Sequence, residues 1–248
     1  GTQIIANITR VYIFVVEVCT QVVVFHYVCC QQKSRQILFI MISRFVKINF
    51  FTLLLVPYVV GLIGILLPLT RSFFLSLTPY MLLFSFVIVY LEEGRWVIRN
   101  LLAILLIMAF SFGAEYLGVN YGYLFGDYTY GSILGFKYYK VPLIIPITWA
   151  LLSIASRSLV NLVTNSYAIS AFLTAVVITA YDFLLELVAV RFGWWWWNTG
   201  NIPIFNYICW FVLSFIFQLL FRKVPSITGR SYWIIFVHLI FYWVLLLM

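Results

Sequence analysis

Charged residues are scarce in this 248-residue chain, where Asp, Glu, Lys and Arg together make up 9% of the sequence. An ordinary soluble domain has about 25%. Hydrophobic residues make up 65%, and a water-soluble domain of this length could not bury so much apolar surface. The composition therefore excludes a disordered chain, a disulfide-rich secreted scaffold and a water-soluble enzyme, and it predicts an integral membrane protein.

Histidine and cysteine are also few. His26 and His238 are the only histidines, too few for the histidine-rich di-iron centres of membrane enzymes, and each is expected to be a packed or interfacial residue. The four cysteines form no CxxC pair, which leaves a zinc site and disulfides unsupported. Phosphate-binding GK[ST] loops and dinucleotide fingerprints are absent as well. The sequence predicts no metal site and no cofactor.

Long apolar runs make up most of the chain. Each is long enough to cross the hydrocarbon core as a helix, and they cover residues 48–68, 75–91, 98–117, 141–160, 168–190, 204–221 and 231–248. We therefore predict an all-α, polytopic membrane helix bundle with seven core transmembrane helices, in one domain over residues 41–248. A further apolar run covers residues 11–30. Because the first methionine is Met41, residues 1–40 are expected to be either an additional N-terminal helix or a non-native upstream extension.

The net charge of +8 comes from basic residues that lie between the apolar runs, which favours a membrane topology signal over a nucleic-acid partner. Ten of the 15 Lys and Arg residues fall in alternate connections, at residues 33–47, 92–99, 157–167 and 222–230. These connections are expected to face the cytoplasm. The long connections 118–140 and 191–203 are then expected outside.

Four acidic residues are expected at the same outer depth of the membrane. Asp182 and Glu186 lie four residues apart and so on one helical face, Glu115 is near the end of another span, and Asp127 follows that span. Ionisable groups inside spans are costly and usually mark a function. We therefore predict one polar pocket formed by these four carboxylates.

A structural alternative pairs these acids with nearby basic residues, Asp182 or Glu186 with Arg191 and Glu115 with Lys137 or Lys140. Two carboxylates as close as Asp182 and Glu186 would resist sharing one basic partner. The other acidic residues of the spans' connections, Glu92 and Glu93, start a short cytoplasmic loop and are expected to be solvated.

Two aromatic segments flank these acids. Residues 113–131 read GAEYLGVNYGYLFGDYTYG, with glycines at every fourth position that favour either a helix–helix contact or an outer segment folded into the protein. Residues 193–207 read GWWWWNTGNIPIFNY, and the four tryptophans favour either an interfacial belt or an aromatic wall for a flat ligand or a cation. Pro142 and Pro146 predict a kinked helix start.

These residues offer carboxylate acid–base chemistry on an apolar molecule. Burial keeps one carboxyl protonated so that it can donate, and a second carboxylate can position water or accept a proton.

The chain resembles the bacterial and archaeal carotenoid biosynthesis membrane proteins, a family that includes the cyanobacterial-type carotenoid 1,2-hydratase and bisanhydrobacterioruberin hydratase. The resemblance covers about residues 45–225 and leaves residues 1–40 outside. It rests on Glu115 with GVNYGYLFGDYTYGSILGFK (118–137), VPLIIPITW (141–149), Asp182 to Ala189, and the W-W-N…IPIFNYICW run (196–210).

The resemblance implies a multi-pass enzyme of a bacterial or archaeal cytoplasmic membrane that adds water to the terminal double bond of an acyclic carotenoid. The product is a tertiary alcohol, and no metal or redox cofactor is needed because hydration changes no net oxidation state. The implied partners are the acyclic carotenoid, the lipid bilayer and other carotenoid-pathway enzymes, with no nucleic acid.

The implied roles follow the four acids. Asp182 or Glu186 donates the proton, and Glu115 or Asp127 orients the water and takes its proton. The substrate-binding and water-holding residues are then Asn120, Tyr121, Tyr128, Trp149, Trp194, Trp196 and Asn206.

The chain departs from the family pattern at Leu187, where relatives often have proline, and at Phe205, where they often have glutamine. Both positions are expected beside the pocket. Other functions therefore stay open: a non-catalytic carotenoid-binding or assembly subunit, or an end-group isomerase or cyclase that uses the same acids. An isoprenoid transporter is disfavoured by the lack of an inverted repeat.

Overall fold

The computed structural model describes residues 50–93, 98–221 and 229–248. The chain divides into two units, residues 1–52 and 53–248. Apart from residues 50–52 at the start of α3, all features below belong to the second unit. The predicted run 11–30, His26 and the two interpretations of residues 1–40 lie outside the described residues.

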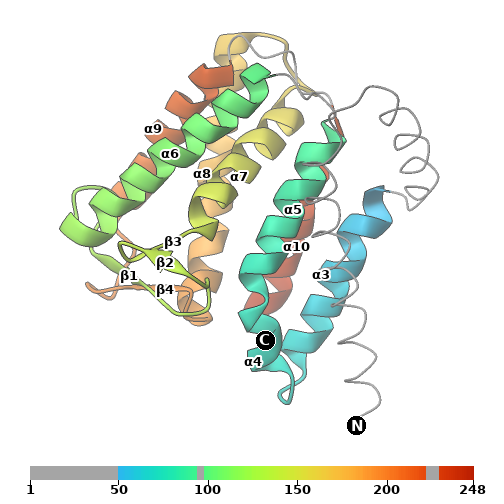
Figure 1. Ribbon diagram of the computed structural model, residues 1–248, viewed down its shortest axis with the longest axis vertical. Coiled ribbons are helices and arrows are strands. Elements are labelled where there is room, and N and C mark those ends of the chain that lie inside the picture. The colour runs from blue at the N-terminus through green and yellow to red at the C-terminus, as the bar shows by residue number, and fades with distance from the viewer. Residues whose placement is uncertain (1–49, 94–97, 222–228) are drawn as a thin grey trace, which may run out of the picture. The chain divides into compact units, whose positions relative to one another are not determined.

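The described part is mostly helical, which confirms the all-α class (Figure 1). Its helices are α3 (Phe50–Leu66), α4 (Arg71–Ser76), α5 (Thr78–Glu92), α6 (Ile98–Tyr121), α7 (Ile144–Val160), α8 (Tyr167–Arg191), α9 (Ile204–Leu220) and α10 (Trp233–Leu246). Each of the seven predicted spans overlaps one of the longer helices, and the short α4 was not predicted.

Two of these helices are long and apolar enough to cross a membrane on their own. They are Asn100–Tyr121 within α6 and Tyr167–Arg191, each with a mean hydropathy of 1.9. The remaining apolar helices of the described part have 10–17 residues, whereas a straight crossing needs about 20.

Helix α7 packs against α5, α6, α8, α9 and α10, and almost all of its side chains are buried (Figure 1). Small residues such as Ala150, Ser153 and Ser156 are fully buried along it. They let neighbouring helices approach closely. The predicted span 141–160 therefore forms the central helix of the unit.

Four short strands lie beside the ends of α6, α7 and α8 (Figure 1). Strand β1 (Tyr128–Tyr130) pairs antiparallel with β4 (Trp195–Trp197), so that Tyr128 faces Trp197 and Tyr130 faces Trp195 across the ladder. Strand β2 (Lys137–Tyr138) pairs with β3 (Val141–Pro142). The connections 118–140 and 191–203, predicted on one side of the membrane, therefore meet in one two-stranded ribbon.

Gly122 and Gly126 lie beyond the end of α6, whereas Gly118 lies within it and packs closely against Tyr128. Gly122 has φ +67° and Gly126 has φ +132°, backbone conformations that suit glycine and lie outside any helix. A helix contact through all three of Gly118, Gly122 and Gly126 is therefore wrong, because α6 ends at Tyr121. Pro142 lies in β3, so the expected helix start falls two residues later, at Ile144.

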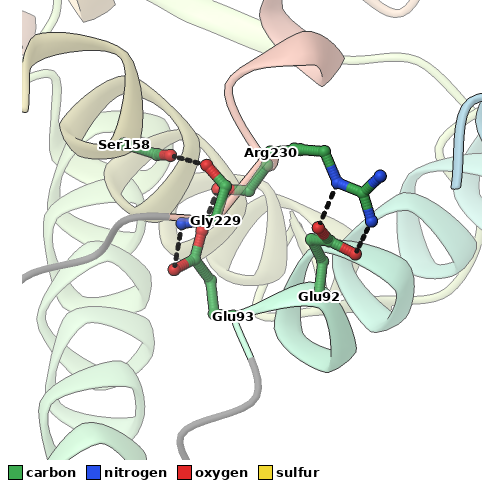
Figure 2. Close-up of polar contacts among 6 residues, drawn as sticks. Glu92, Glu93, Ser158, Gly229 and Arg230 are labelled. Atoms are coloured by element: carbon green, nitrogen blue, oxygen red, sulfur yellow. Dashed lines mark hydrogen bonds and ion pairs between the residues drawn. The ribbon is translucent and has the colours of Figure 1, made fainter. Parts of the chain in front are cut away.

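The expectation that Glu92 and Glu93 are solvated is wrong (Figure 2). The Arg230 guanidinium donates from Nε to Glu92 Oε1 at 2.7 Å, and the Glu92 side chain is only 18% exposed. Glu93 accepts hydrogen bonds from the backbone N–H of Gly229 (3.4 Å) and the hydroxyl of Ser231. These contacts fasten the end of α5 to the start of the α10 segment.

Helix α7 also contacts this cluster, because the Ser158 hydroxyl in its last turns donates to the Gly229 carbonyl at 2.9 Å (Figure 2). The ends of α5 and α7 and the segment before α10 therefore lie together. Their connections are the ones predicted to share the cytoplasmic side.

Candidate active site

A cavity of about 40 Å³ lies between α6, α7, α8, α9 and the β1–β4 ribbon. Its polar lining is Glu115, Glu186, Asn206 and Thr148. Most of the remaining lining is aromatic: Phe125, Tyr128, Tyr130, Trp149, Trp194, Trp195, Trp197, Trp210 and Tyr242. One water needs about 10–15 Å³ by this measure, so the cavity has room for two or three waters.

Glu115 projects from α6 and is only 3% exposed. Its Oε2 accepts hydrogen bonds from the hydroxyls of Tyr128 (2.6 Å) and Tyr130 (2.7 Å). Its Oε1 accepts one from the indole N–H of Trp149 at 3.1 Å. Three donors from β1 and α7 therefore hold one carboxylate.

Glu186 on α8 is held in the same manner. The indole N–H groups of Trp195 and Trp197 both donate to Oε2 at 2.9 Å, and the Asn206 amide donates to Oε1 at 3.1 Å. The residue is 2% exposed. Since a carboxylate has about four acceptor positions, Glu186 and Glu115 each keep one unfilled position, on Oε1.

Asp182 lies one helical turn before Glu186 and is fully buried. The same Asn206 Nδ2 that binds Glu186 also donates to Asp182 Oδ2 at 3.0 Å. The other oxygen, Oδ1, has no hydrogen-bond partner among the described residues. Asn206 thus bridges two adjacent carboxyl groups, and Asp182 itself does not line the cavity.

The two-stranded ribbon explains how the donors reach both carboxylates. Side chains alternate between the faces of a strand, and in β1 and β4 the outer positions are the more buried ones. Tyr128, Tyr130, Trp195 and Trp197 therefore share the buried face, while Trp196 is 47% exposed. Sequence reasoning missed Tyr130, Trp195 and Trp197, because strands of three residues, YTY and WWW, carry no readable alternation.

Tyr128 and Tyr130 remain neutral donors. Burial raises the pKa of both phenols well above the usual range, and the negative charge of Glu115 raises it further. Their protons are therefore available to Glu115 at any pH near neutrality.

Trp149 and Trp194 complete the aromatic wall. Trp149 is 1% exposed, and its ring stacks on that of Trp210 with 4.0 Å between centroids. The Trp194 indole N–H is buried and has no hydrogen-bond partner among the described residues. The belt interpretation of the four tryptophans therefore fits Trp196 only.

Several predicted site residues lie away from the cavity. Asp127 is exposed and accepts a hydrogen bond from the Asn198 amide at 2.6 Å. Asn120 donates to the carbonyls of Tyr116 and Tyr139, and Tyr121 is 55% exposed. Of the four predicted carboxylates, the structure brings together Glu115, Asp182 and Glu186 but not Asp127.

Leu187 and Phe205 are not beside the pocket as expected. They are 43% and 46% exposed and do not line the cavity, because each follows or precedes an inward residue by one position on its helix. Helix α8 also continues unbroken through Leu187.

The alternative ion pairs do not form among the described residues. Arg191 donates to the Leu246 carbonyl, and the Lys137 ammonium donates to the Tyr130 carbonyl at 2.6 Å. Phenols, indoles and one amide bind the three buried acids instead.

Residues 76–248 match the family model described as "Carotenoid biosynthesis protein", and the chain belongs to this family.

A curated relative is the bisanhydrobacterioruberin hydratase of the archaeon Haloarcula japonica, with 28% identity over 198 residues. The match covers 72% of this chain and 66% of the relative, slightly less than two thirds of its length. No solved structure matches the chain.

Proposed function

We propose that this protein is a carotenoid hydratase, which adds water to the terminal double bond of an acyclic carotenoid and forms a tertiary alcohol. The observation that carries the proposal is the pair of buried carboxylates, Glu115 and Glu186, each with one unfilled acceptor position at an aromatic cavity of water size. The curated relative is named as a hydratase, in agreement with this chemistry.

The proton source is the Asp182–Glu186 pair. Two buried carboxyl groups bridged by one amide cannot both ionise without strong repulsion, so the pair retains a proton. Of these two residues, only Glu186 lines the cavity. Because two indole N–H groups occupy its Oε2, a proton on Glu186 must sit on Oε1, the oxygen with the unfilled position.

Glu115 is the base. Its unfilled position on Oε1 accepts a hydrogen bond from a cavity water, and its three donors hold it in one orientation. In the reaction, the Glu186 proton bonds to the less substituted alkene carbon, and the water oxygen bonds to the more substituted one. One water proton passes to Glu115, and its return to the Asp182–Glu186 pair restores the site.

The aromatic wall suits the intermediate, a tertiary carbocation. The faces of tryptophan and tyrosine attract a cation with about 0.5–2 kcal/mol each. Trp149, Trp195 and Trp197 lie close enough to the two glutamates to donate to them. A cation formed between these carboxylates therefore also meets their rings.

We also propose that the described unit is a multi-pass membrane domain. The exposed face of α9 is an apolar stripe at helical spacing, Ile204, Ile208, Val212, Ile216 and Leu219, while its buried face carries Asn206, Ser214 and Gln218. A water-soluble helix has the reverse pattern. Two groups of connections also support the alternating topology. One is joined by the contacts of Gly229 with Glu93 and Ser158, and the other forms the β1–β4 ribbon. We propose that the first group, 92–99, 157–167 and 222–230, lies in the cytoplasm.

The cavity of about 40 Å³ has room for water but not for a carotenoid end group. A cavity of about 150 Å³ is needed for a molecule the size of benzene, so a branched end group requires lining side chains to move. Leu134 and Leu82 are the aliphatic lining residues contributed by the β1–β2 connection and α5. We propose that the carotenoid end displaces these two side chains.

The test is production of the chain in a host that makes an acyclic carotenoid, followed by mass analysis of the pigments. Hydration adds the mass of one water for each reacted end, and a variant with Asp182→Asn and Glu186→Gln should add none while still inserting and folding. A product of unchanged mass but altered absorption would indicate an isomerase or cyclase. Pigment that co-purifies unchanged would indicate a binding subunit.

A further inference from the structure

A buried chain of hydroxyl groups and one imidazole leads to the cavity from α3 and α5. The Tyr58 hydroxyl lies 2.6 Å from Ser85 Oγ and 2.5 Å from His238 Nε2. On the other side of the ring, the Tyr181 hydroxyl lies 2.7 Å from His238 Nδ1 and 2.8 Å from the Tyr242 hydroxyl. Tyr242 is a lining residue of the cavity. The proposed hydration has so far given these hydrogen-bonded side chains no role.

We assign the direction of the first bonds from Ser85. The Met81 carbonyl, 2.8 Å from Ser85 Oγ, can only accept, so we assign the single Ser85 proton to that bond, and Ser85 then accepts from Tyr58. With its own proton used, the Tyr58 oxygen must accept from His238. The imidazole proton is therefore on Nε2.

The direction of the last bonds follows from the imidazole. His238 is fully buried and bonded to two phenols rather than to a carboxylate, which favours the neutral ring. Because its proton is on Nε2, Nδ1 must accept from Tyr181. The Tyr181 oxygen then accepts from Tyr242. With the bonds assigned in this way, Tyr242 donates its proton to Tyr181 across 2.8 Å, and only acceptor capacity remains on the Tyr242 oxygen.

We propose that Tyr242 is a further residue of this site, whose phenolic oxygen accepts a hydrogen bond from the reacting water, and that His238 is the positioning residue that keeps this oxygen an acceptor. The inference rests on the proposed hydration. Water has two protons, and Glu115 takes one of them. A second acceptor fixes the other proton, so that a lone pair of the water oxygen is turned toward the carbocation. A Tyr242 hydroxyl that donated instead would occupy that lone pair.

The test is a double-mutant cycle in lipid vesicles, with an acyclic carotenoid that the unaltered chain hydrates. Tyr242→Phe should lower kcat about tenfold with KM unchanged, the loss expected for one hydrogen bond. His238→Leu should lower it to the same extent, because Tyr181 then turns its proton toward Tyr242. The double variant should be no slower than either single variant, since both changes remove one interaction.

A conservative variant separates positioning from packing. His238→Gln carries an N–H toward Tyr58 and an oxygen toward Tyr181, so it should retain most of the rate that His238→Leu loses. Tyr232→Phe, at the start of the same α10 segment and away from the cavity, is the matched control. Rate losses that multiply in the double variant, or full kcat in Tyr242→Phe, would overturn the inference.

A readout without activity covers variants that fail to fold. Nitrogen-15 NMR of histidine-labelled protein, in a His26→Gln background, should find the His238 proton on Nε2 and an unprotonated Nδ1. A proton on Nδ1 would contradict the direction of the chain. If the unaltered protein hydrates no acyclic carotenoid, the proposed function fails, whereas the NMR result still decides the bond direction.

Discussion

Replacement of Asp182 by asparagine tests the proton shared by Asp182 and Glu186 with little effect on folding. Asp182 Oδ2 accepts from Asn206, while Oδ1 is buried without a partner among the described residues. An asparagine of the same shape keeps its oxygen at the Oδ2 position and puts its NH₂ where no donor competes. A hydrogen bond to a charged acceptor contributes about 1.5–3 kcal/mol, against about 0.5–1.5 for a neutral one. We therefore expect Asp182→Asn to lower the free energy of unfolding by about 1 kcal/mol.

The effect on hydration should be far larger. Without Asp182, nothing forces the pair to retain a proton, and Glu186 is left as an ordinary carboxylate held by three donors. Loss of general acid catalysis slows a reaction about 10²–10⁴-fold, or about 3–5 kcal/mol in the barrier. Initial rates in vesicles, with thermal unfolding followed in detergent, would measure both quantities. A full rate in Asp182→Asn would refute the shared proton.

Glu186→Gln is the matched comparison. Its NH₂ must face either the two indole donors on the Oε2 side or the Asn206 amide on the Oε1 side. Either orientation places the NH₂ against at least one donor, so this variant should lose about 1–3 kcal/mol of stability in addition to activity. Equal stability of the two amide variants would contradict the hydrogen-bond assignment.

Three further predictions test the supports of the site. Trp195→Phe removes one donor to Glu186 and should destabilise the protein by about 1.5–3 kcal/mol, whereas Trp196→Phe on the exposed face should stay within about 0.5 kcal/mol in the same unfolding assay. Leu134→Ala should enlarge the cavity and lower KM for the carotenoid in initial-rate measurements, at a stability loss of about 2–5 kcal/mol; an unchanged KM would exclude Leu134 from the substrate path. Gly229→Ala places a methyl group 2.8 Å from Glu93 Oε1 and should loosen the α5 end, seen as faster proteolysis of that connection than in the parent chain.

Helical periodicity and membrane depth were enough to predict much of the fold and part of the site. Asp182 and Glu186 share a face because they are four residues apart, and Glu115 reaches the same level because its helix runs in the same direction. The same helical periodicity also predicts that Leu187 points away from the pocket, as the structure shows. Glu92 was mispredicted because its partner, Arg230, is 138 residues away in sequence.

The donors Tyr130, Trp195 and Trp197 could not be predicted in this way, because strands of three residues are too short for a periodic signal. Asp127 was chosen by charge, yet it lies one position before Tyr128 and so on the other face of the ribbon. Charge identifies which residues need partners. Only the ribbon register determines which residues become those partners.

The ribbon also gives the two glutamates different kinds of donor, and this difference matches their proposed roles. Tyrosine hydroxyls bind Glu115 Oε2, and a hydroxyl can turn from donor to acceptor when the carboxylate gains a proton. Indole N–H groups bind Glu186 Oε2, and an N–H cannot reverse. Glu115 can therefore pass between its charged and neutral forms without losing partners, as a base must. Glu186 can be protonated only on Oε1, which fixes where its proton is delivered.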